Sequence, residues 1–228
     1  MNIATLSDSD AAQKALMACF DDFYRTAVSL IPFEREAEFS VLDLGAGTGL
    51  LSELIQQDFP NCSITLCDLA EHKLKRAMQR FEGKDEKLRF YVSDYIQQAF
   101  PENNYDLIVS ALSLHHCSTA QFNMVLSKIY AALNPGGHFI NADQALGSTD
   151  NIEKIYARKW LKDANDHGAK QQDIEKALQA MKASKRLALE TQLNLMSAKG
   201  FVDLNHWYQY FSFCVYSGVK PMKDIFTP

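Results

Sequence analysis

The sequence lacks the features that mark membrane, secreted and nucleic-acid-binding proteins. No stretch approaches the roughly 18 uninterrupted apolar residues that a membrane span needs. No early Lys or Arg precedes a long apolar run, as in a secretory signal. The formal net charge is -5, whereas non-specific nucleic-acid binding favours a basic face. We therefore expect neither a membrane nor a nucleic acid as a partner.

Cysteine is also scarce, and its pattern does not indicate a disulfide framework. The five cysteines are scattered and odd in number: Cys19, Cys62, Cys67, Cys117 and Cys214. This is typical of reduced, mostly buried thiols in a cytoplasmic protein. With 228 residues, 47% of them hydrophobic and 22% charged, the chain is expected to form a single domain, 1–228, with a full core. Whether it forms a homodimer is left open.

An alternation of strands and helices fills the middle of the chain, 33–147. Apolar runs predict strands at 39–44, 63–68, 88–92, 105–111 and 138–142. Helices are expected over 48–58, 71–81 and 119–133, followed by a turn at Asn134-Pro135-Gly136-Gly137. This alternation predicts an α/β fold with a Rossmann-like, doubly wound and mostly parallel sheet. Ligands of such sheets lie beyond the carboxyl ends of the strands.

The N-terminal segment has a helical pattern. Apolar residues three or four apart predict one helix over 8–30, which Pro32 stops. It would form an N-terminal helical lid, 1–32. The lid either packs its Phe face on the core or lays Tyr24 over the ligand pocket.

The segments after the core differ from it in character. Charged helical sequence predicts a helical cap over 148–199. Tyr156 and Trp160 are four residues apart and share one helical face, so they either stack on a substrate or attach the cap to the sheet. The β-rich sequence in 200–228 predicts an antiparallel C-terminal hairpin that completes the sheet.

A glycine-rich turn follows the first strand. In Val41-Leu42-Asp43-Leu44-Gly45-Ala46-Gly47-Thr48-Gly49, an apolar run leads to a turn whose backbone can touch a ligand. The spacing differs from the dinucleotide pattern, because Leu50 stands where that pattern has its last glycine. The Lys beside Ser or Thr of a nucleotide phosphate loop is also missing from this turn. The turn therefore lacks the usual groups for binding phosphates.

Aspartates end the first three strands, and each suits a different part of a ligand. Asp43 would repel a pyrophosphate but suit an ammonium group. Asp68, about 20 residues beyond the turn, is placed for a ribose diol, and Asp94 for the exocyclic amine of adenine. The alternatives are a turn cap for Asp43, a helix N-cap for Asp68 and a plain loop acid for Asp94. A cationic adenosyl amino acid fits this set better than NAD does.

Over residues 39–143 the sequence resembles the class I S-adenosylmethionine-dependent methyltransferases. The similarity rests on the glycine turn, Cys67-Asp68-Leu69, Ser93-Asp94-Tyr95, Tyr105-Asp106-Leu107-Ile108-Val109-Ser110-Ala111 and Leu133-Asn134-Pro135-Gly136-Gly137. The resemblance implies a seven-stranded sheet with an antiparallel last strand, and S-adenosyl-L-methionine as the cofactor. By this resemblance, Gly45, Ala46 and Gly47 would contact the methionine part of the cofactor. Asp68 and Leu69 would hold the ribose and flank the adenine, and Asp94 and Tyr95 would lie at the adenine edge. Ser110 and Ala111 would lie under the methionine and the sulfonium.

Candidates for the chemistry lie where an acceptor should approach. His115 and His116 follow the fourth strand, and either could deprotonate or orient an acceptor. Asp143 ends the fifth strand and could line the acceptor pocket. The alternatives are turn histidines bonded to backbone and a loop-capping acid. Cys117 lies beside the histidines, but no second ligand pair has suitable spacing, so no metal is expected.

We therefore predict a cytoplasmic methyltransferase that acts on a small-molecule acceptor and releases S-adenosyl-L-homocysteine. Ser110-Ala111-Leu112-Ser113 differs from the Asn-Pro-Pro-Tyr type of motif of amino-base methyltransferases, which counts against nucleobase amines. Two alternatives remain. One is a regulatory or scaffold protein that binds an adenosyl cofactor without catalysis. The other is an NAD-dependent oxidoreductase, which the glycine spacing disfavours.

Overall fold

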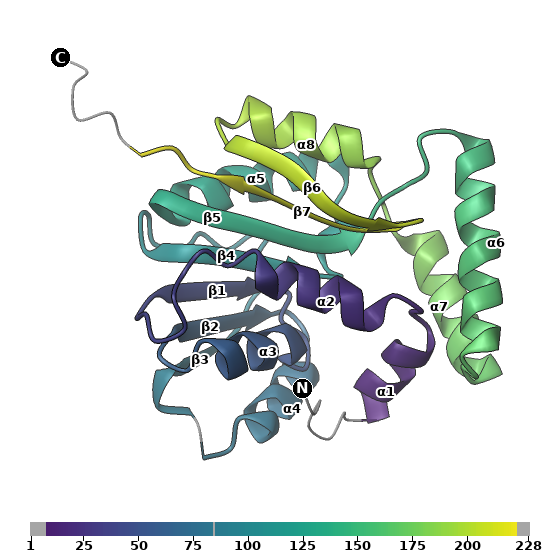
Figure 1. Ribbon diagram of the computed structural model, residues 1–228, viewed down its shortest axis with the longest axis horizontal. Helices are drawn as coiled ribbons and strands as arrows, with labels where there is room; N and C mark the ends of the chain where they lie inside the picture. Colours follow the sequence, from purple (N-terminus) through teal and green to yellow (C-terminus); the bar gives the residue numbers. More distant parts are fainter. Residues whose placement is uncertain (1–7, 84, 223–228) are drawn as a thin grey trace.

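The computed structural model describes residues 8–83 and 85–222, arranged around a seven-stranded sheet. In chain order the strands are β1 (Ser40–Leu44), β2 (Ser63–Asp68), β3 (Leu88–Val92), β4 (Tyr105–Ala111), β5 (Leu133–Gln144), β6 (Val202–Tyr210) and β7 (Phe213–Val219). Their order across the sheet is β3-β2-β1-β4-β5-β7-β6 (Figure 1). Strands β1 to β5 pair in parallel, and β7 is antiparallel to both β5 and β6. The predicted doubly wound, mostly parallel sheet with an antiparallel C-terminal pair is confirmed.

Helices cover both faces of this sheet. They are α1 (Asp8–Ala15), α2 (Phe20–Ser29), α3 (Leu50–Asp58), α4 (Glu71–Arg80), α5 (Thr119–Ala132), α6 (Asp150–Asp166), α7 (Gln171–Ala183) and α8 (Leu189–Ala198), with short 3₁₀ turns η1 (Asp85–Lys87) and η2 (Leu114–His116). Side chains alternate along a strand, so Val41 and Leu42 of β1 belong to two separate apolar layers. Helices α2, α3 and α4 pack in the layer of Val41, and α5 and α8 in that of Leu42.

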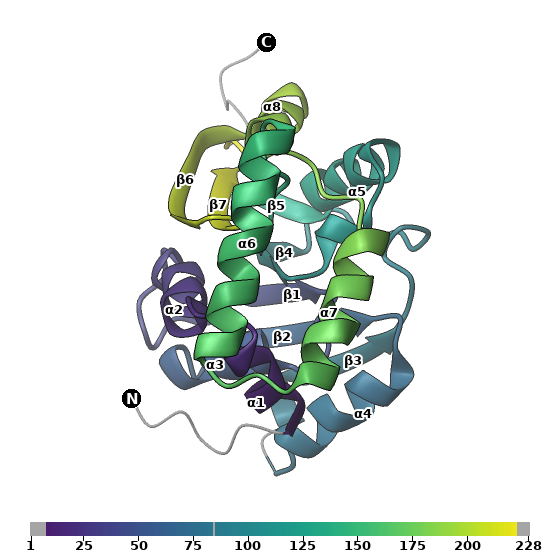
Figure 2. The same ribbon diagram turned by 90° about the vertical axis from the view of Figure 1, so that its right-hand side faces the viewer.

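The sequence predicted one cap over 148–199, and the structure divides this segment. Helices α6 and α7 stand beyond the end of the sheet, whereas α8 returns to the sheet beside α5 (Figures 1 and 2). Met196 of α8 is fully buried in the apolar layer on that face, which explains why α8 leaves the cap. Across 8–83 and 85–222, no helix combines the length and apolar character needed to cross a membrane.

The single helix expected over 8–30 is two helices, α1 and α2. The break at 16–19 contains neither glycine nor proline, and it buries Met17 and Cys19. Asp10 of α1 pairs with Arg80 of α4, so a long-range contact holds α1. Local periodicity contains no trace of such a contact, which is why the sequence pattern predicted a continuous helix.

The turn expected at 134–137 is a bulge inside β5. Tyr105 of β4 pairs with Leu133, but Leu107 pairs with His138, so the residues between Leu133 and His138 leave the ladder. Gly136 adopts a φ of 80°, and its N–H donates to the Lys220 carbonyl at 2.8 Å. Glycine is thus needed here for backbone conformation, as expected, but within a longer strand.

Gly49 and Gly83 have the same φ but different surroundings, so substitutions at the two positions separate the cost of backbone strain from the cost of crowding. A Cβ on Gly49, at the start of α3, would lie 2.9 Å from Phe81 and 3.1 Å from Ala77. Gly83 has the same φ of 78°, and a Cβ there would meet no described atom within 4 Å. We expect Gly83→Ala to lower the unfolding free energy by about 1–2 kcal/mol through strain alone. Gly49→Ala should lower the unfolding free energy by about 1–3 kcal/mol more than Gly83→Ala does, because the side chains next to the new Cβ must shift. Urea unfolding measures both losses, and equal values would contradict the tight packing.

Candidate active site

The glycine turn is packed between two other loops. The N–H groups of Gly45 and Ala46 donate to the Cys67 carbonyl, at 2.8 and 3.1 Å. On the opposite side, a Cβ on Gly45 would lie 1.9 Å from Ser113 Oγ, so glycine lets the loop after β4 come this close. The turn therefore joins the end of β2 to the loop that leads to His115.

A cavity of about 130 Å³, which we call the turn cavity, lies against this turn. Its wall includes Asp43, residues 45–48, Tyr24 of α2 and Ala111 at the end of β4. Asp43 is only 1% exposed, and its Oδ2 accepts from Ser52 Oγ at 2.7 Å, whereas Oδ1 has no hydrogen-bond partner among the described atoms. Burial raises the pKa of Asp43 to about 7. A buried acceptor without a donor suits a ligand that brings a positive donor, such as an ammonium group.

The other two strand-end aspartates hold nearby backbone. Asp68 Oδ2 accepts from Gly47 N–H at 2.8 Å, and Oδ1 accepts from Ala70 N–H at 2.7 Å. Asp68 thus supports the glycine turn and the start of α4 together. Asp94 Oδ1 accepts from Ile96 N–H at 2.8 Å. Because a carboxylate oxygen has two lone pairs, each of these acids retains acceptor capacity for a ligand.

The remaining residues of the predicted cofactor set lie in different environments. Leu69, at the end of β2, is 67% exposed. The Tyr95 hydroxyl lies 3.0 Å from Ser113 Oγ, behind the glycine turn. Ser110 is fully buried and donates to a backbone carbonyl of β1 at 2.8 Å, whereas Ala111 lines the turn cavity. Neighbouring residues of a strand face opposite sides, so Ser110 is directed away from that cavity.

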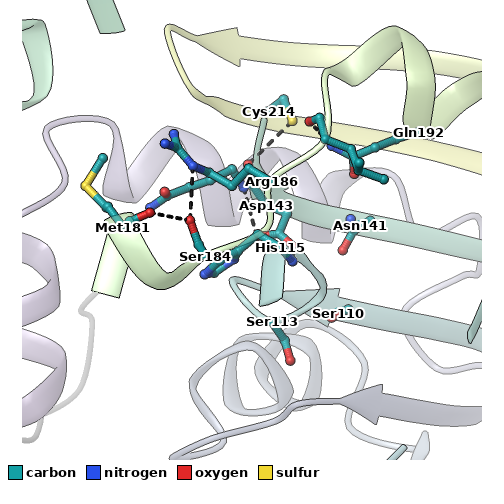
Figure 3. Close-up of polar contacts among 12 residues, drawn as sticks. Ser110, Ser113, His115, Asn141, Asp143, Met181, Ser184, Arg186, Gln192 and Cys214 are labelled. Atoms are coloured by element: carbon teal, nitrogen blue, oxygen red, sulfur yellow. Dashed lines mark hydrogen bonds and ion pairs between the residues drawn. The ribbon is translucent and has the colours of Figure 1, made fainter. Parts of the chain in front are cut away.

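His115 and Asp143 come together at the ends of β4 and β5. His115 Nδ1 lies 2.6 Å from Asp143 Oδ1, and the His115 backbone N–H donates to Oδ2 at 3.0 Å (Figure 3). Asp143 is 1% exposed, and its Oδ1 also accepts from Gln144 N–H at 2.8 Å. An ionised carboxylate only accepts hydrogen bonds, so Nδ1 carries the hydrogen. Nε2 is therefore left as the basic nitrogen of the ring.

His116 is placed differently from His115. Its side chain is exposed, and the two rings lie side by side with centroids 4.0 Å apart. It is not part of the wall of the turn cavity. Cys117 is buried, and the described residues contain no group of three or more His, Cys, Asp or Glu that could hold a metal ion.

A second cavity, of about 140 Å³, lies between the sheet and the pair α6–α7, and we call it the cap cavity. Most of its wall is apolar and includes Leu16, Met17, Leu112, Trp160, Met181 and Phe213. Its polar wall residues are Gln13, His115 and Gln144. Gln13 and Leu112 line both cavities, so the two are neighbours. Leu112 has a φ of 50°, and such strained backbone is often kept at functional sites.

The three aromatic residues predicted to contact a substrate do not lie together. Trp160 is 6% exposed and lines the cap cavity. Tyr156 accepts from Gln209 Nε2 at 3.1 Å and packs edge-on against Phe211, so it faces the β6–β7 hairpin instead. Tyr24 lines the turn cavity and is buried. Of the three, only Trp160 is therefore found at the cap cavity.

A buried ion-pair cluster, absent from the sequence prediction, holds α1 against the site. Arg80 of α4 pairs with Asp10 of α1 and with Glu53 of α3, and these side chains are 9%, 1% and 18% exposed. Arg80 Nε donates to the Thr48 carbonyl at 2.8 Å, and Thr48 Oγ1 donates to Asp10 Oδ1 at 2.9 Å. Because Thr48 belongs to the glycine turn, the cluster ties the turn to α1. In the sequence Arg80 ends a charged run that is typical of a solvated helix face.

Comparison with known proteins agrees with this geometry. Residues 41–137, which contain the glycine turn, most of β1 and all of β2 to β4, match the family model of a methyltransferase domain. The chain is 38% identical over 77 residues to malonyl-[acyl-carrier protein] O-methyltransferase 2 of Ilyobacter polytropus. That alignment covers 34% of this chain and 29% of the relative, so the chain spans less than a third of the relative's length.

Two solved structures have the same fold. One is the S-adenosylmethionine-dependent methyltransferase SibL in its apo form, with a TM-score of 0.65 and 19% identity over 90% of this chain and 57% of that chain. The other is human N-acetylserotonin methyltransferase in complex with SAM, with a TM-score of 0.63 and 20% identity over 93% of this chain and 55% of that chain. The family model, the sheet order and the motifs at the strand ends agree: residues 41–137 match a methyltransferase domain, and the fold is similar to that of the class I S-adenosylmethionine-dependent methyltransferases.

Proposed function

We propose that the chain is an enzyme that uses S-adenosyl-L-methionine to methylate a small-molecule acceptor and releases S-adenosyl-L-homocysteine. The observation that carries this proposal is that Asp43 lines the turn cavity while its Oδ1 has no hydrogen-bond partner among the described atoms. The ammonium group of the cofactor would supply the missing donor and would offset the cost of ionising a buried carboxyl. A pyrophosphate, as in NAD, would bring further negative charge towards it.

The residues that would hold the cofactor lie along the carboxyl ends of β1 to β4. They are Asp43, Gly45, Ala46, Gly47 and Ala111 for the methionine part, Asp68 and Leu69 for the ribose and adenine, and Asp94 and Tyr95 for the adenine edge. Ser110 would instead hold β4 to β1, because its hydroxyl is already bonded there. When bound, the cofactor supplies a methyl group activated by the positive sulfur.

On the acceptor side, His115 would take up a proton at Nε2, and Asp143 would keep the ring in place. Asp143 bonds both the ring and the backbone of His115, while Lys185 N–H donates to the His115 carbonyl at 2.9 Å. The buried carboxylate would also stabilise the charged ring that forms. These contacts support His115 over the exposed His116 as the base. A protein that only binds the cofactor would have no use for such a base beside a second cavity.

The cytoplasm is the compartment that we propose for this reaction. All five cysteines are free and buried, as expected where thiols are kept reduced. The acceptor is proposed to be a small molecule because the cap cavity is small and mostly apolar.

Binding of S-adenosyl-L-homocysteine tests the role of Asp43. Asp43→Asn should weaken binding about tenfold to hundredfold, because it removes the partner of the ammonium group. In the wild type, the Asp43 carboxyl, with its pKa of about 7, must be ionised to bind, so affinity should fall as the pH is lowered through about 7. Asp43→Asn should lose this dependence. Calorimetry between about pH 6 and about pH 8 measures both effects.

Asp22→Asn is the matched control, because Asp22 is exposed on α2 and should change neither the affinity nor its pH dependence. Wild-type affinity and pH dependence in Asp43→Asn would contradict the proposed cofactor site.

Turnover tests the base. His115→Gln should lower kcat about 10²-fold to 10⁴-fold, because proton removal is lost, while the affinity for S-adenosyl-L-homocysteine stays unchanged. His116→Gln is the matched neighbour and should keep kcat within about twofold. Release of S-adenosyl-L-homocysteine in the presence of a panel of small acceptors provides the assay. A similar loss in both variants, or no loss in either, would show that His115 is not the base.

A further inference from the structure

We propose that the methyl acceptor is a neutral, single-ring hydroxy compound, a phenol, bound in the cap cavity. The inference rests on the proposed function and names its substrate class. Three features of the cavity carry it: the volume, the absence of charge on the described wall and the place of His115.

The volume of the cap cavity corresponds to one ring. It measures about 140 Å³, close to the roughly 150 Å³ of an engineered apolar cavity that binds benzene. Trp160 and Phe213 offer aromatic surface for a ring, and Met17 and Met181 can adapt to its outline. A fused polycyclic acceptor would exceed this space.

The wall of the cap cavity is unsuited to a charged acceptor. Of the described residues that line it, only His115 is titratable. Two nearby cations are engaged elsewhere: Lys159 pairs with Asp163, and Arg186 Nη2 donates to Glu153 Oε1 at 2.7 Å. Arg186 Nη1 has no hydrogen-bond partner among the described atoms, but Arg186 is not among the residues that line the cavity. A carboxylate or ammonium group held here would be desolvated without a counter-charge, which is costly.

His115 determines which group of the acceptor reacts. The phenol hydroxyl would donate to Nε2, near Gln13 and Leu112, which also line the turn cavity. The phenol oxygen forms a bond to the methyl carbon that the cofactor supplies, its proton passes to Nε2, and the electron pair of the broken carbon–sulfur bond stays on sulfur. The product is an aryl methyl ether, and the proton then leaves His115 for solvent. A phenol hydroxyl has a pKa of about 10, like that of tyrosine, so it gives its proton to histidine more readily than the less acidic hydroxyl of an alkyl alcohol would.

Fluorescence of Trp160 gives a direct readout of binding, because this residue lines the cavity. The chain has two tryptophans, so Trp207→Phe leaves Trp160 as the sole emitter of its kind. Titrations with phenol, benzoate and benzylammonium would be made with S-adenosyl-L-homocysteine present. We expect saturable quenching by phenol, with a Kd at least about tenfold lower than for either charged ring.

Two variants of α7 show whether binding occurs in this cavity. Ala177 lines the cavity, so Ala177→Leu should weaken phenol binding at least about tenfold. Ala183 is exposed on the same helix, and Ala183→Leu should leave the Kd within about twofold. Should Ala177→Leu fail to fold, Met181→Ala enlarges the cavity and should tighten the binding of 2-naphthol about tenfold.

The binding results can overturn the acceptor class alone or the acceptor class together with the proposed function. Tighter binding of a charged ring than of phenol, or phenol binding that neither α7 change affects, would overturn the acceptor class. Calorimetry on the same samples separates this from the proposed function. If the protein binds S-adenosyl-L-homocysteine but not phenol, the acceptor class alone is overturned. If it binds phenol but not S-adenosyl-L-homocysteine, both the methyltransferase role and the acceptor class are overturned.

Discussion

The close approach of Ser113 to Gly45 is the contact on which the arrangement of the site depends. A side chain at position 45 would collide with Ser113, so the bare backbone of glycine lets the loop after β4 rest on the turn. This loop runs from Leu112, which lines both cavities, through Ser113 to His115. Asp143 then holds His115 from the end of β5. One short segment thus positions the proposed cofactor site and the proposed base relative to each other.

The N-terminal helices complete both cavities from the other side. Gln13 and Tyr24 belong to the wall of the turn cavity, and Gln13 Nε2 donates to the Tyr24 hydroxyl at 3.0 Å. The pairing of Asp10 with Arg80 keeps α1 in this place. Breaking a buried ion pair by removing one partner costs about 3–5 kcal/mol. The predicted lid is therefore fixed to the folded domain by buried charge as well as by apolar contacts.

Most of the fold could be predicted because it depends on local signals. Strands β2, β3 and β4 begin and end where their apolar runs do. Asp43, near the end of β1, and Asp68, at the end of β2, lie at the glycine turn. The break between α1 and α2 and the return of α8 to the sheet could not be predicted, since both arise from long-range contacts.

The site was less predictable than the fold. Adjacent histidines look alike in a sequence, whereas in the structure the contact with Asp143 and the wall of the cap cavity distinguish His115 from His116. Tyr156 and Trp160 have the spacing of one helical face, yet Tyr156 contacts the hairpin while Trp160 lines the cap cavity. Gln13 belongs to no motif, so nothing in the sequence marks its place between the two cavities.

We expect the glycine turn and Asp43 to hold the amino-acid end of the cofactor next to the cap cavity. A crystal structure with S-adenosyl-L-homocysteine would show this arrangement. The ammonium group should lie within hydrogen-bond distance of Asp43 Oδ1, and the sulfur should face the boundary formed by Gln13 and Leu112. A cofactor bound away from Asp43, or with its sulfur directed away from the cap cavity, would rule this arrangement out.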